Sequence, residues 1–249
     1  MKRKVKTAKK IEKASHTPPW AADAVRHLRR VDPVMDRIIQ QAGPVRIARR
    51  PENFQALVRA IIFQQLAGVA ALAIFNRFVT IIGGGRFPSP DQVVAAADED
   101  LRKAGLSRGK MTYIRDLAIK VRDGEINFRR FLKADDEEII AELTRVRGIG
   151  RWTAEMFLMF NLWRPDVLAV GDLGLRSAAT REYRVKLPVT EKALREMGER
   201  WRPYRTAAAW YLWQSARIVT PDATKTKAPP ARSKKTPSKP RTAKSSKIK

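Results

Sequence analysis

The stretch that decides the fold spans residues 143–178 and reads LTRVRGIGRWTAEMFLMFNLWRPDVLAVGDLGLRSA. It contains a glycine-flanked turn, a segment with helical spacing of its apolar residues, and an acidic residue that follows a loop. In the turn, Gly148 and Gly150 flank Ile149, and glycine adopts backbone angles that other residues avoid. We therefore expect two helices joined by a very tight turn, a helical hairpin over residues 135–162.

The predicted hairpin is suited to bind an anion. The first backbone N–H groups of a helix have no partner within the helix, so the start of the second helix presents free donors. Arg145, Arg147 and Arg151 place positive charge around the same point. A phosphate group is therefore the expected partner of this turn.

The run from Val146 to Ala154 resembles the helix-hairpin-helix of the DNA glycosylase superfamily that carries a Gly/Pro-rich loop and a catalytic aspartate. The run Val170-Gly171-Asp172-Leu173-Gly174 follows about twenty residues later, where that family keeps its aspartate. The chain is most similar to the bacterial 3-methyladenine DNA glycosylase II group, from residue 53 to residue 217. The resemblance implies an all-α, two-lobed fold and a partner in double-stranded DNA that contains damaged bases.

Asp172 has the chemistry that cleavage of an N-glycosidic bond requires. Positive charge builds on the sugar as the base departs, and a nearby carboxylate stabilises that charge and orients the attacking water. Aspartate is also a favoured N-cap residue at the start of a helix, so the pattern alone leaves both roles open. The resemblance, through the spacing from the hairpin, implies the catalytic role.

Aromatic residues are expected to form the pocket for an extruded base. Trp152 and Trp213 match pocket positions of the 3-methyladenine enzymes, and Tyr204 lies in the matching run that leads to Trp213. Met156 replaces a tyrosine of the bacterial relative. A methylated purine is cationic, and an electron-rich ring attracts a cation by roughly 0.5–2 kcal/mol. Three other aromatic residues at helical spacing are interpreted as core: Phe160, Trp163 and Trp210.

The hairpin sequence also indicates that the protein does not cleave the DNA strand. Bifunctional relatives have a nucleophilic lysine two residues after the second hairpin glycine, and this lysine forms a Schiff base. The present chain has Trp152 at that position, so no amine is available there. We expect a monofunctional glycosylase that leaves an abasic site, with no general acid because a cationic base is already a good leaving group.

A second DNA-contacting turn is expected within the long helical pattern of residues 53–82. The family keeps a Gln-containing turn there, and the run Gln64-Gln65-Leu66-Ala67 matches it, with Gln65 and Leu66 as the predicted DNA contacts. Leu66 is the candidate wedge, because leucine can fill the gap left by an extruded nucleotide without hydrogen bonds; the alternative is an ordinary core leucine. For Lys110 a solvated helix end is favoured at least as much as a phosphate contact. The remaining predicted DNA contacts are Arg147, Gly148, Ile149, Gly150, Arg151 and Thr153.

The resemblance implies one optional ion and no required cofactor. In the superfamily, hairpin carbonyls hold a monovalent cation, K⁺ or Na⁺, that bridges to a DNA phosphate. By position these are the backbone carbonyls of Thr144, Val146 and Ile149. The chain has no cysteine, which excludes disulfides, thiolate zinc sites and cysteine-ligated iron–sulfur clusters. His16 and His27 are too few for a histidine metal site.

Charge and composition point to the same partner. The net charge of +26 on 249 residues favours a polyanion, with nucleic acid ahead of a membrane surface. No apolar stretch is long enough and free enough of polar residues to span a bilayer, and the basic N-terminus lacks the apolar region of a secretory signal. We expect a monomeric cytoplasmic protein that associates with the nucleoid.

The organisation of the chain follows from its composition. Residues 1–18 form a lysine-rich arm and residues 221–249 a Lys/Pro-rich tail, and both are expected to be disordered. The tail adds sequence-independent affinity for DNA or only keeps the protein soluble. Residues 19–220 are the expected glycosylase domain. The bacterial relative has a small β-domain before its helices, and too few residues precede Asn53 here to build one.

Two other functions are consistent with the sequence. The first is a DNA-binding protein that has the hairpin but no catalysis, and the presence of Asp172 argues against it. The second is a glycosylase for oxidised or deaminated bases, and the pair Trp152 and Trp213 argues against that. A dinucleotide-binding loop is excluded because Thr153 interrupts the G-x-G-x-x-G pattern and no strand is predicted before it.

Overall fold

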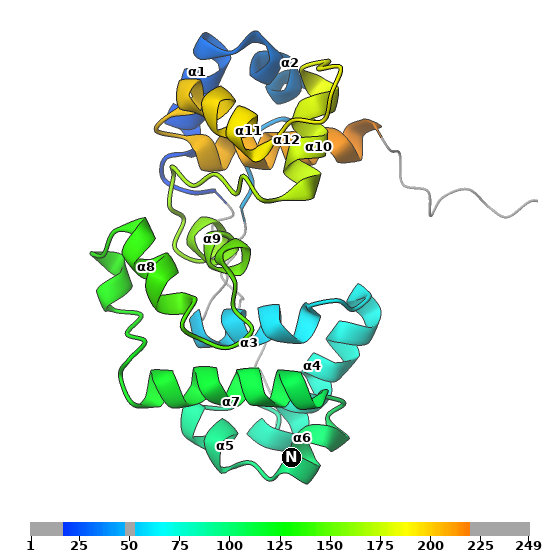
Figure 1. The fold of residues 1–249 in the computed structure, drawn as a ribbon, viewed down its shortest axis with the longest axis vertical. Coiled ribbons are helices and arrows are strands. Elements are labelled where there is room, and N and C mark those ends of the chain that lie inside the picture. Colours follow the sequence, from blue (N-terminus) through cyan, green and yellow to red (C-terminus); the bar gives the residue numbers. More distant parts are fainter. Residues whose placement is uncertain (1–16, 48–52, 220–249) are drawn as a thin grey trace, which may run out of the picture.

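The structure is a computed structural model that describes residues 17–47 and 53–219, with the side chains left out at 217–219. Every regular element in these ranges is a helix, and the helices form two lobes (Figure 1). The prediction of an all-α, two-lobed fold is confirmed. The predicted arm 1–18 and tail 221–249 lie outside the described residues, apart from Thr17 and Pro18.

The first lobe combines the two ends of the described chain. It contains α1 (Ala21–Val31), α2 (Pro33–Ala42), α10 (Leu173–Glu182), α11 (Glu191–Gly198), the short 3-10 helix η2 (Glu199–Trp201) and α12 (Arg205–Val219). The last helix, α12, packs against α1, α2 and α10. The N-terminal helices therefore complete a lobe whose other members come from the end of the domain.

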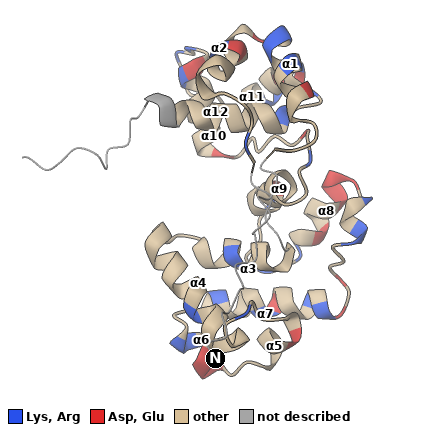
Figure 2. Cartoon of the chain, turned by 180° about the vertical axis from the view of Figure 1, so that it is seen from behind, with Lys and Arg blue, Asp and Glu red and all other residues tan. Residues whose placement is uncertain are grey.

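The second lobe is continuous in sequence. It contains α3 (Asn53–Phe63), α4 (Gly68–Gly83), α5 (Pro90–Ala95), α6 (Asp98–Lys103) and α7 (Arg108–Arg122). The 3-10 helix η1 (Arg130–Leu132) leads to α8 (Asp136–Leu143) and α9 (Arg151–Phe160), which form the predicted hairpin between the lobes. Lys and Arg occur in both lobes of the described part, interspersed with Asp and Glu (Figure 2). None of the described helices is long and apolar enough to cross a bilayer.

A buried carboxylate holds the first lobe together. Asp32 is 1% exposed and caps α2 by accepting hydrogen bonds from the N–H groups of Val34 and Met35 at 2.9 and 3.2 Å. Its other oxygen accepts from the hydroxyl of Tyr183 at 2.6 Å and from the indole N–H of Trp201 at 2.9 Å. Four donors satisfy this buried charge, so segments far apart in the sequence are joined at one point.

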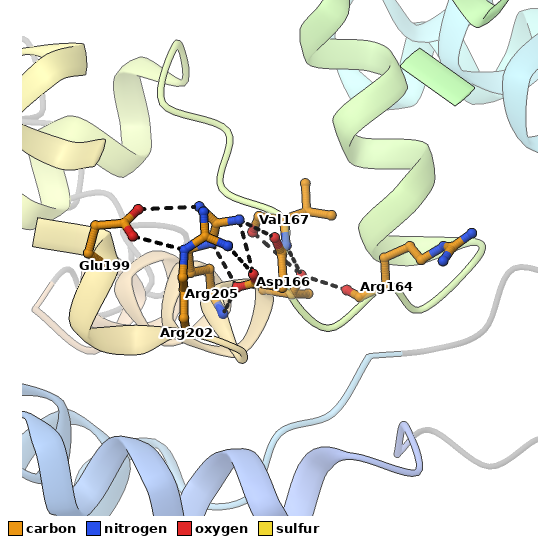
Figure 3. Close-up of polar contacts among 7 residues, drawn as sticks. Arg164, Asp166, Val167, Glu199, Arg202 and Arg205 are labelled. Atoms are coloured by element: carbon orange, nitrogen blue, oxygen red, sulfur yellow. Dashed lines mark hydrogen bonds and ion pairs between the residues drawn. The ribbon is translucent and has the colours of Figure 1, made fainter. Parts of the chain in front are cut away.

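The loop between α9 and α10 is fixed to the start of α12, as Figure 3 shows. Arg202 Nη1 donates to Asp166 Oδ2 at 2.8 Å, and Arg205 Nε donates to Asp166 Oδ1 at 2.7 Å. The N–H of Val167 donates to the hydroxyl of Thr206 at 3.1 Å. These contacts hold the loop that leads into α10, where the predicted catalytic residue lies.

The predicted break in the long helical pattern is present. α3 ends at Phe63 and α4 begins at Gly68. Between them Gln65 has a φ of 55°, the left-handed conformation that residues other than glycine rarely adopt. Residues 64–66 form a tight turn, which we call the wedge turn. Residues 146–150, the corresponding turn between α8 and α9, we call the hairpin turn.

Candidate active site

Asp172 lies at the start of α10 and receives three hydrogen bonds. Its Oδ1 accepts the backbone N–H of Leu175 at 2.6 Å, which makes Asp172 the N-cap of the helix. Oδ2 accepts the indole N–H of Trp152 from α9 at 2.8 Å, and Oδ1 accepts that of Trp213 from α12 at 3.2 Å. The carboxylate therefore caps the helix and is also held between the two predicted pocket tryptophans.

This carboxylate forms part of the wall of a cavity of about 760 Å³. That volume is in the range of pockets that hold small organic molecules or a nucleobase. On α9, Trp152, Met156 and Phe160 recur every fourth residue and present one face to the cavity. The lining residues are Ala42, Pro44, Arg46, Trp152, Met156, Phe160, Asp172, Trp210, Trp213 and Gln214.

One predicted aromatic assignment needs correction, and two need extension. Phe160 and Trp210 pack against the hydrophobic core, as interpreted from the sequence, and they also line the cavity, because the pocket wall continues the apolar faces of α9 and α12. Tyr204 was assigned to the pocket, but it is not among the lining residues. Its ring lies edge-on to His27, with 5.6 Å between the ring centroids. Trp163 packs against the hydrophobic core, in agreement with the sequence interpretation.

Sequence reasoning missed two polar residues at this cavity. Arg46 follows α2, and Gln214 lies on α12 next to Trp213. Both can donate hydrogen bonds into a cavity whose other walls are largely aromatic. Neither residue belongs to a recognisable motif. The sequence offered one signal for Gln214, which follows the predicted pocket residue Trp213, and none for Arg46.

A second cavity of about 520 Å³ adjoins the same face of α9. It shares Trp152, Met156 and Phe160 with the first cavity and is bounded on the other side by α3 and the wedge turn. Leu66, at the end of this turn, is 39% exposed, so it is not a core residue. Its role as a wedge stays a prediction, and the geometry places its turn beside the pocket.

The two glycines of the hairpin turn differ in what surrounds them. Gly148 has a φ of 81°, and a Cβ built there would lie 2.2 Å from the ring of Tyr113. Gly150, the N-cap of α9, has a φ of −92°, and nothing lies within 4 Å of its Cβ position. The fold therefore requires glycine at position 148, while position 150 opens outward. Ile149 and Thr153 are 4% and 7% exposed, so their side chains face inward.

Two of the predicted basic contacts already have partners. Arg151 forms ion pairs with Glu137 and with Glu155, the latter at 3.1 Å. The ammonium group of Lys110 donates to the carbonyl oxygens of Ile62 at 2.7 Å and Gln64 at 2.9 Å. The side chain of Arg147 is exposed. Contacts of these residues with DNA stay predictions. The side chain of Lys110 also joins α7 to the end of α3 and to the turn that follows it.

Known proteins are similar to this chain in sequence and in fold. A family model described as HhH-GPD superfamily base excision DNA repair protein matches residues 58–203. DNA-3-methyladenine glycosylase 1 of Schizosaccharomyces pombe is 36% identical over 197 residues, which are 78% of this chain and 86% of that protein.

Two solved structures are similar over most of their length. The 3-methyladenine DNA glycosylase of S. pombe, in complex with abasic DNA, aligns with a TM-score of 0.68 and 34% identity over 78% of this chain and 97% of that one. A DNA-3-methyladenine glycosidase from Bacillus halodurans aligns with a TM-score of 0.73 and 39% identity over 81% and 91% of the two chains. The protein described here belongs to the HhH-GPD superfamily of base excision DNA repair proteins.

Proposed function

We propose that this protein is a monofunctional DNA glycosylase that hydrolyses the N-glycosidic bond of extruded alkylated purines, such as 3-methyladenine and 7-methylguanine, and leaves an abasic site. The observation that carries the proposal is the carboxylate of Asp172 in the wall of an aromatic cavity, bonded to two indole N–H groups. The relatives named above, which are called 3-methyladenine glycosylases, support the same substrate class.

The geometry suits a dissociative hydrolysis. As the bond between C1′ and the base nitrogen breaks, its electron pair leaves with the base and neutralises the charge that methylation introduced. The sugar becomes oxocarbenium-like, and the Asp172 carboxylate stabilises this cation. Water then adds to C1′ and loses a proton, with the carboxylate as acceptor. Three donors hold the carboxylate in one orientation, so it need not reorganise during the reaction.

The aromatic walls suit a cationic base. Trp152, Trp213, Phe160 and Trp210 surround the cavity, and each ring face can attract a positively charged purine by roughly 0.5–2 kcal/mol. An unmodified purine is neutral and a poor leaving group, so it gains neither advantage. Discrimination between damaged and normal bases then comes from charge and from leaving-group quality together.

The described part of the cavity wall offers no amine for strand cleavage by a Schiff base. Among the described residues that line it there is no lysine, and Trp152 stands at the position of the nucleophilic lysine in bifunctional relatives. This supports hydrolysis without a lyase step.

DNA is held, in this proposal, at the hairpin turn and the wedge turn. Backbone N–H groups at the start of α9, next to Gly150, bind a phosphate, and Leu66 fills the gap left by the extruded nucleotide. A monovalent cation on the carbonyls of Thr144, Val146 and Ile149 belongs to the same proposal. The Val146 carbonyl accepts the Ile149 N–H at 3.1 Å, and its second lone pair can still bind an ion.

The test is base release from methylated duplex DNA by the parent protein and by Asp172→Asn. Asparagine still offers an oxygen to cap α10, so the variant should fold, and we expect release to fall by about 100-fold or more. Asp91→Asn, an exposed carboxylate in the first turn of α5, is the matched control and should match the parent.

Three other outcomes would redirect the assignment. No release by the parent, with DNA still bound, favours a DNA-binding protein without catalysis. Release of oxidised or deaminated bases only, and no methylated ones, favours the other substrate class. Strand cleavage without added base or amine contradicts the monofunctional mechanism.

A further inference from the structure

One face of α7 contacts both of the turns that the proposed function assigns to DNA. Lys110, Tyr113 and Asp116 follow one another at three-residue spacing, which places them along one side of the helix. Lys110 contacts the wedge turn. Tyr113 and Asp116 contact the hairpin turn. α7 therefore contacts two turns that are more than 80 residues apart in the sequence.

Lys110 contacts the wedge turn directly before its strained residue. Its ammonium group donates to the carbonyls of Ile62, in the last turn of α3, and of Gln64, just after this helix, at 2.7 and 2.9 Å; the last carbonyls of a helix need such partners. The next residue, Gln65, has a φ of 55°. A left-handed residue other than glycine costs free energy and persists only where its surroundings hold it. Burial lowers the pKa of Lys110, as expected for an ammonium group that has left water for these carbonyls.

A single side chain joins the wedge turn directly to the hairpin turn. Gln64 Nε2 donates to the carbonyl oxygen of Gly148 at 2.8 Å. The hairpin turn is itself fixed to α7, because the Arg147 N–H donates to Asp116 Oδ2 at 2.9 Å and the Tyr113 ring lies under Gly148. The two turns are therefore fixed to a common helix and to each other.

We propose that Gln64 and Lys110 are positioning residues that couple the wedge turn to the hairpin turn, so that Leu66 is aimed into the base stack when the hairpin holds the backbone. This inference rests on the proposed function. Extrusion of a paired base costs a few kcal/mol of free energy. A wedge residue in the wrong position offsets less of that cost. A base that is already mispaired costs less to extrude and depends less on the wedge.

The test compares excision of one methylated purine from two duplexes, one with the lesion in a stable pair and one with it mispaired. Gln64→Ala and Lys110→Met are expected to lose about 10-fold or more on the stable pair and less than about threefold on the mispaired lesion. Lys110→Arg, which can still donate to both carbonyls, should restore most of the rate. Single-turnover rates separate this effect from product release.

Two control variants each remove a comparable amide or ammonium contact that lies outside the two turns. Gln40→Ala removes an amide that donates to Asp36 Oδ2 on α2, and Lys103→Met removes exposed ion pairs on α6. Both should match the parent on both duplexes. Thermal unfolding of every variant identifies any that fail to fold, and Gln64→Ala, which loses one exposed hydrogen bond, should keep the parental midpoint.

The outcomes separate this coupling from the proposed function. Equal losses on the two duplexes, or no loss on the stable pair, overturn the coupling. If the parent releases no methylated base from either duplex, the proposed function fails instead. Fluorescence of 2-aminopurine beside the lesion then decides the coupling. A rise on binding by the parent that both variants lack supports it, and equal signals overturn it.

Discussion

At the scale of single residues, the two glycines of the hairpin turn have different physical reasons to be glycine. Gly148 combines a left-handed φ of 81° with a ring in van der Waals contact, so the fold itself excludes a side chain. Gly150 has ordinary backbone angles and open space at its Cβ position. The fold gives no reason for glycine at position 150, whereas close approach of a phosphate to the start of α9 would.

The first prediction contrasts alanine at these two positions. Gly150→Ala should change the free energy of unfolding by less than about 0.5 kcal/mol, but weaken binding to duplex DNA by about 10-fold. Gly148→Ala should destabilise the protein by about 1–3 kcal/mol, because the new methyl group meets Tyr113. Denaturant unfolding and fluorescence anisotropy with labelled DNA measure the two effects. Normal DNA binding by Gly150→Ala would contradict a phosphate contact there.

At the residue scale, the family resemblance singled out Asp172, Trp152 and Trp213, and the structure brings these three side chains into hydrogen-bond contact. Their roles in catalysis and base binding stay predictions. The sequence did not distinguish Phe160 and Trp210 from core, because helical periodicity identifies a buried face but not whether a cavity opens within it. Nor did it reveal that the carbonyls of α3 hold Lys110.

At the scale of helices, capping residues mark several helix starts. Ser89 and Asp135 form capping boxes at the starts of α5 and α8, and Ser107 accepts the N–H of Lys110 at the start of α7. These signals are local, since the cap bonds to its own first turn. The break after Phe63 was located through the resemblance, whereas the left-handed Gln65 had no sequence signal, because contacts from α7 and the hairpin impose it.

The end of α10 is tied to its neighbours by a second buried acid. Glu182 is 7% exposed, and Arg37 of α2 donates to its Oε2 at 3.0 Å. Arg181 donates to its Oε1, also at 3.0 Å. Burial alone would raise the pKa of Glu182, but hydrogen bonds from Arg181, Ser215 and Arg37 together lower it below the usual 4.5.

The second prediction follows from this lowered pKa. The folded state holds the ionised form of Glu182 more favourably than the unfolded chain does, so its contribution is complete above pH 4.5 and is lost as pH falls through the lowered folded pKa. Glu182→Gln should therefore reduce the free energy of unfolding by about 1–2 kcal/mol at neutral pH and by less at about pH 3. Urea unfolding at both pH values tests this, and an equal loss at both would contradict it.

At the scale of the whole molecule, the excess charge is concentrated in part at one end. Residues 221–249 contain eight lysines and two arginines against one aspartate, a net charge of +9 out of +26. Lys and Arg of the described part are distributed over both lobes (Figure 2). The protein should therefore bind DNA of any sequence with an affinity that falls steeply as salt rises.

The third prediction concerns the tail. Removing residues 221–249 should reduce the slope of log affinity against log salt by about 3 and weaken binding to undamaged duplex, because fewer counterions are released. The rate of excision at saturating protein should not change, because Asp172 and the proposed pocket residues all lie in the described part of the chain. A salt titration with and without the tail measures this. An unchanged slope would leave the tail only a solubilising role.

The sequence predicted the fold class of the molecule better than it predicted which residues line the cavity. The resemblance that the hairpin and the aspartate spacing carry was sufficient to predict an all-α, two-lobed fold. The cavity, however, brings Ala42 and Arg46 together with Trp213, residues separated by most of the chain. Such contacts depend on how the first lobe assembles from the two ends of the described chain, through Asp32 and Asp166 among others, and no local pattern encodes them.

The three donors that fix the Asp172 carboxylate affect which substrates the site accepts. A group anchored in this way does not move toward its target, so the deoxyribose has to be delivered to it. The aromatic walls, by contrast, have flat faces that accept many ring shapes. An enzyme built on this plan is permissive about which base it removes and strict about where the sugar stands.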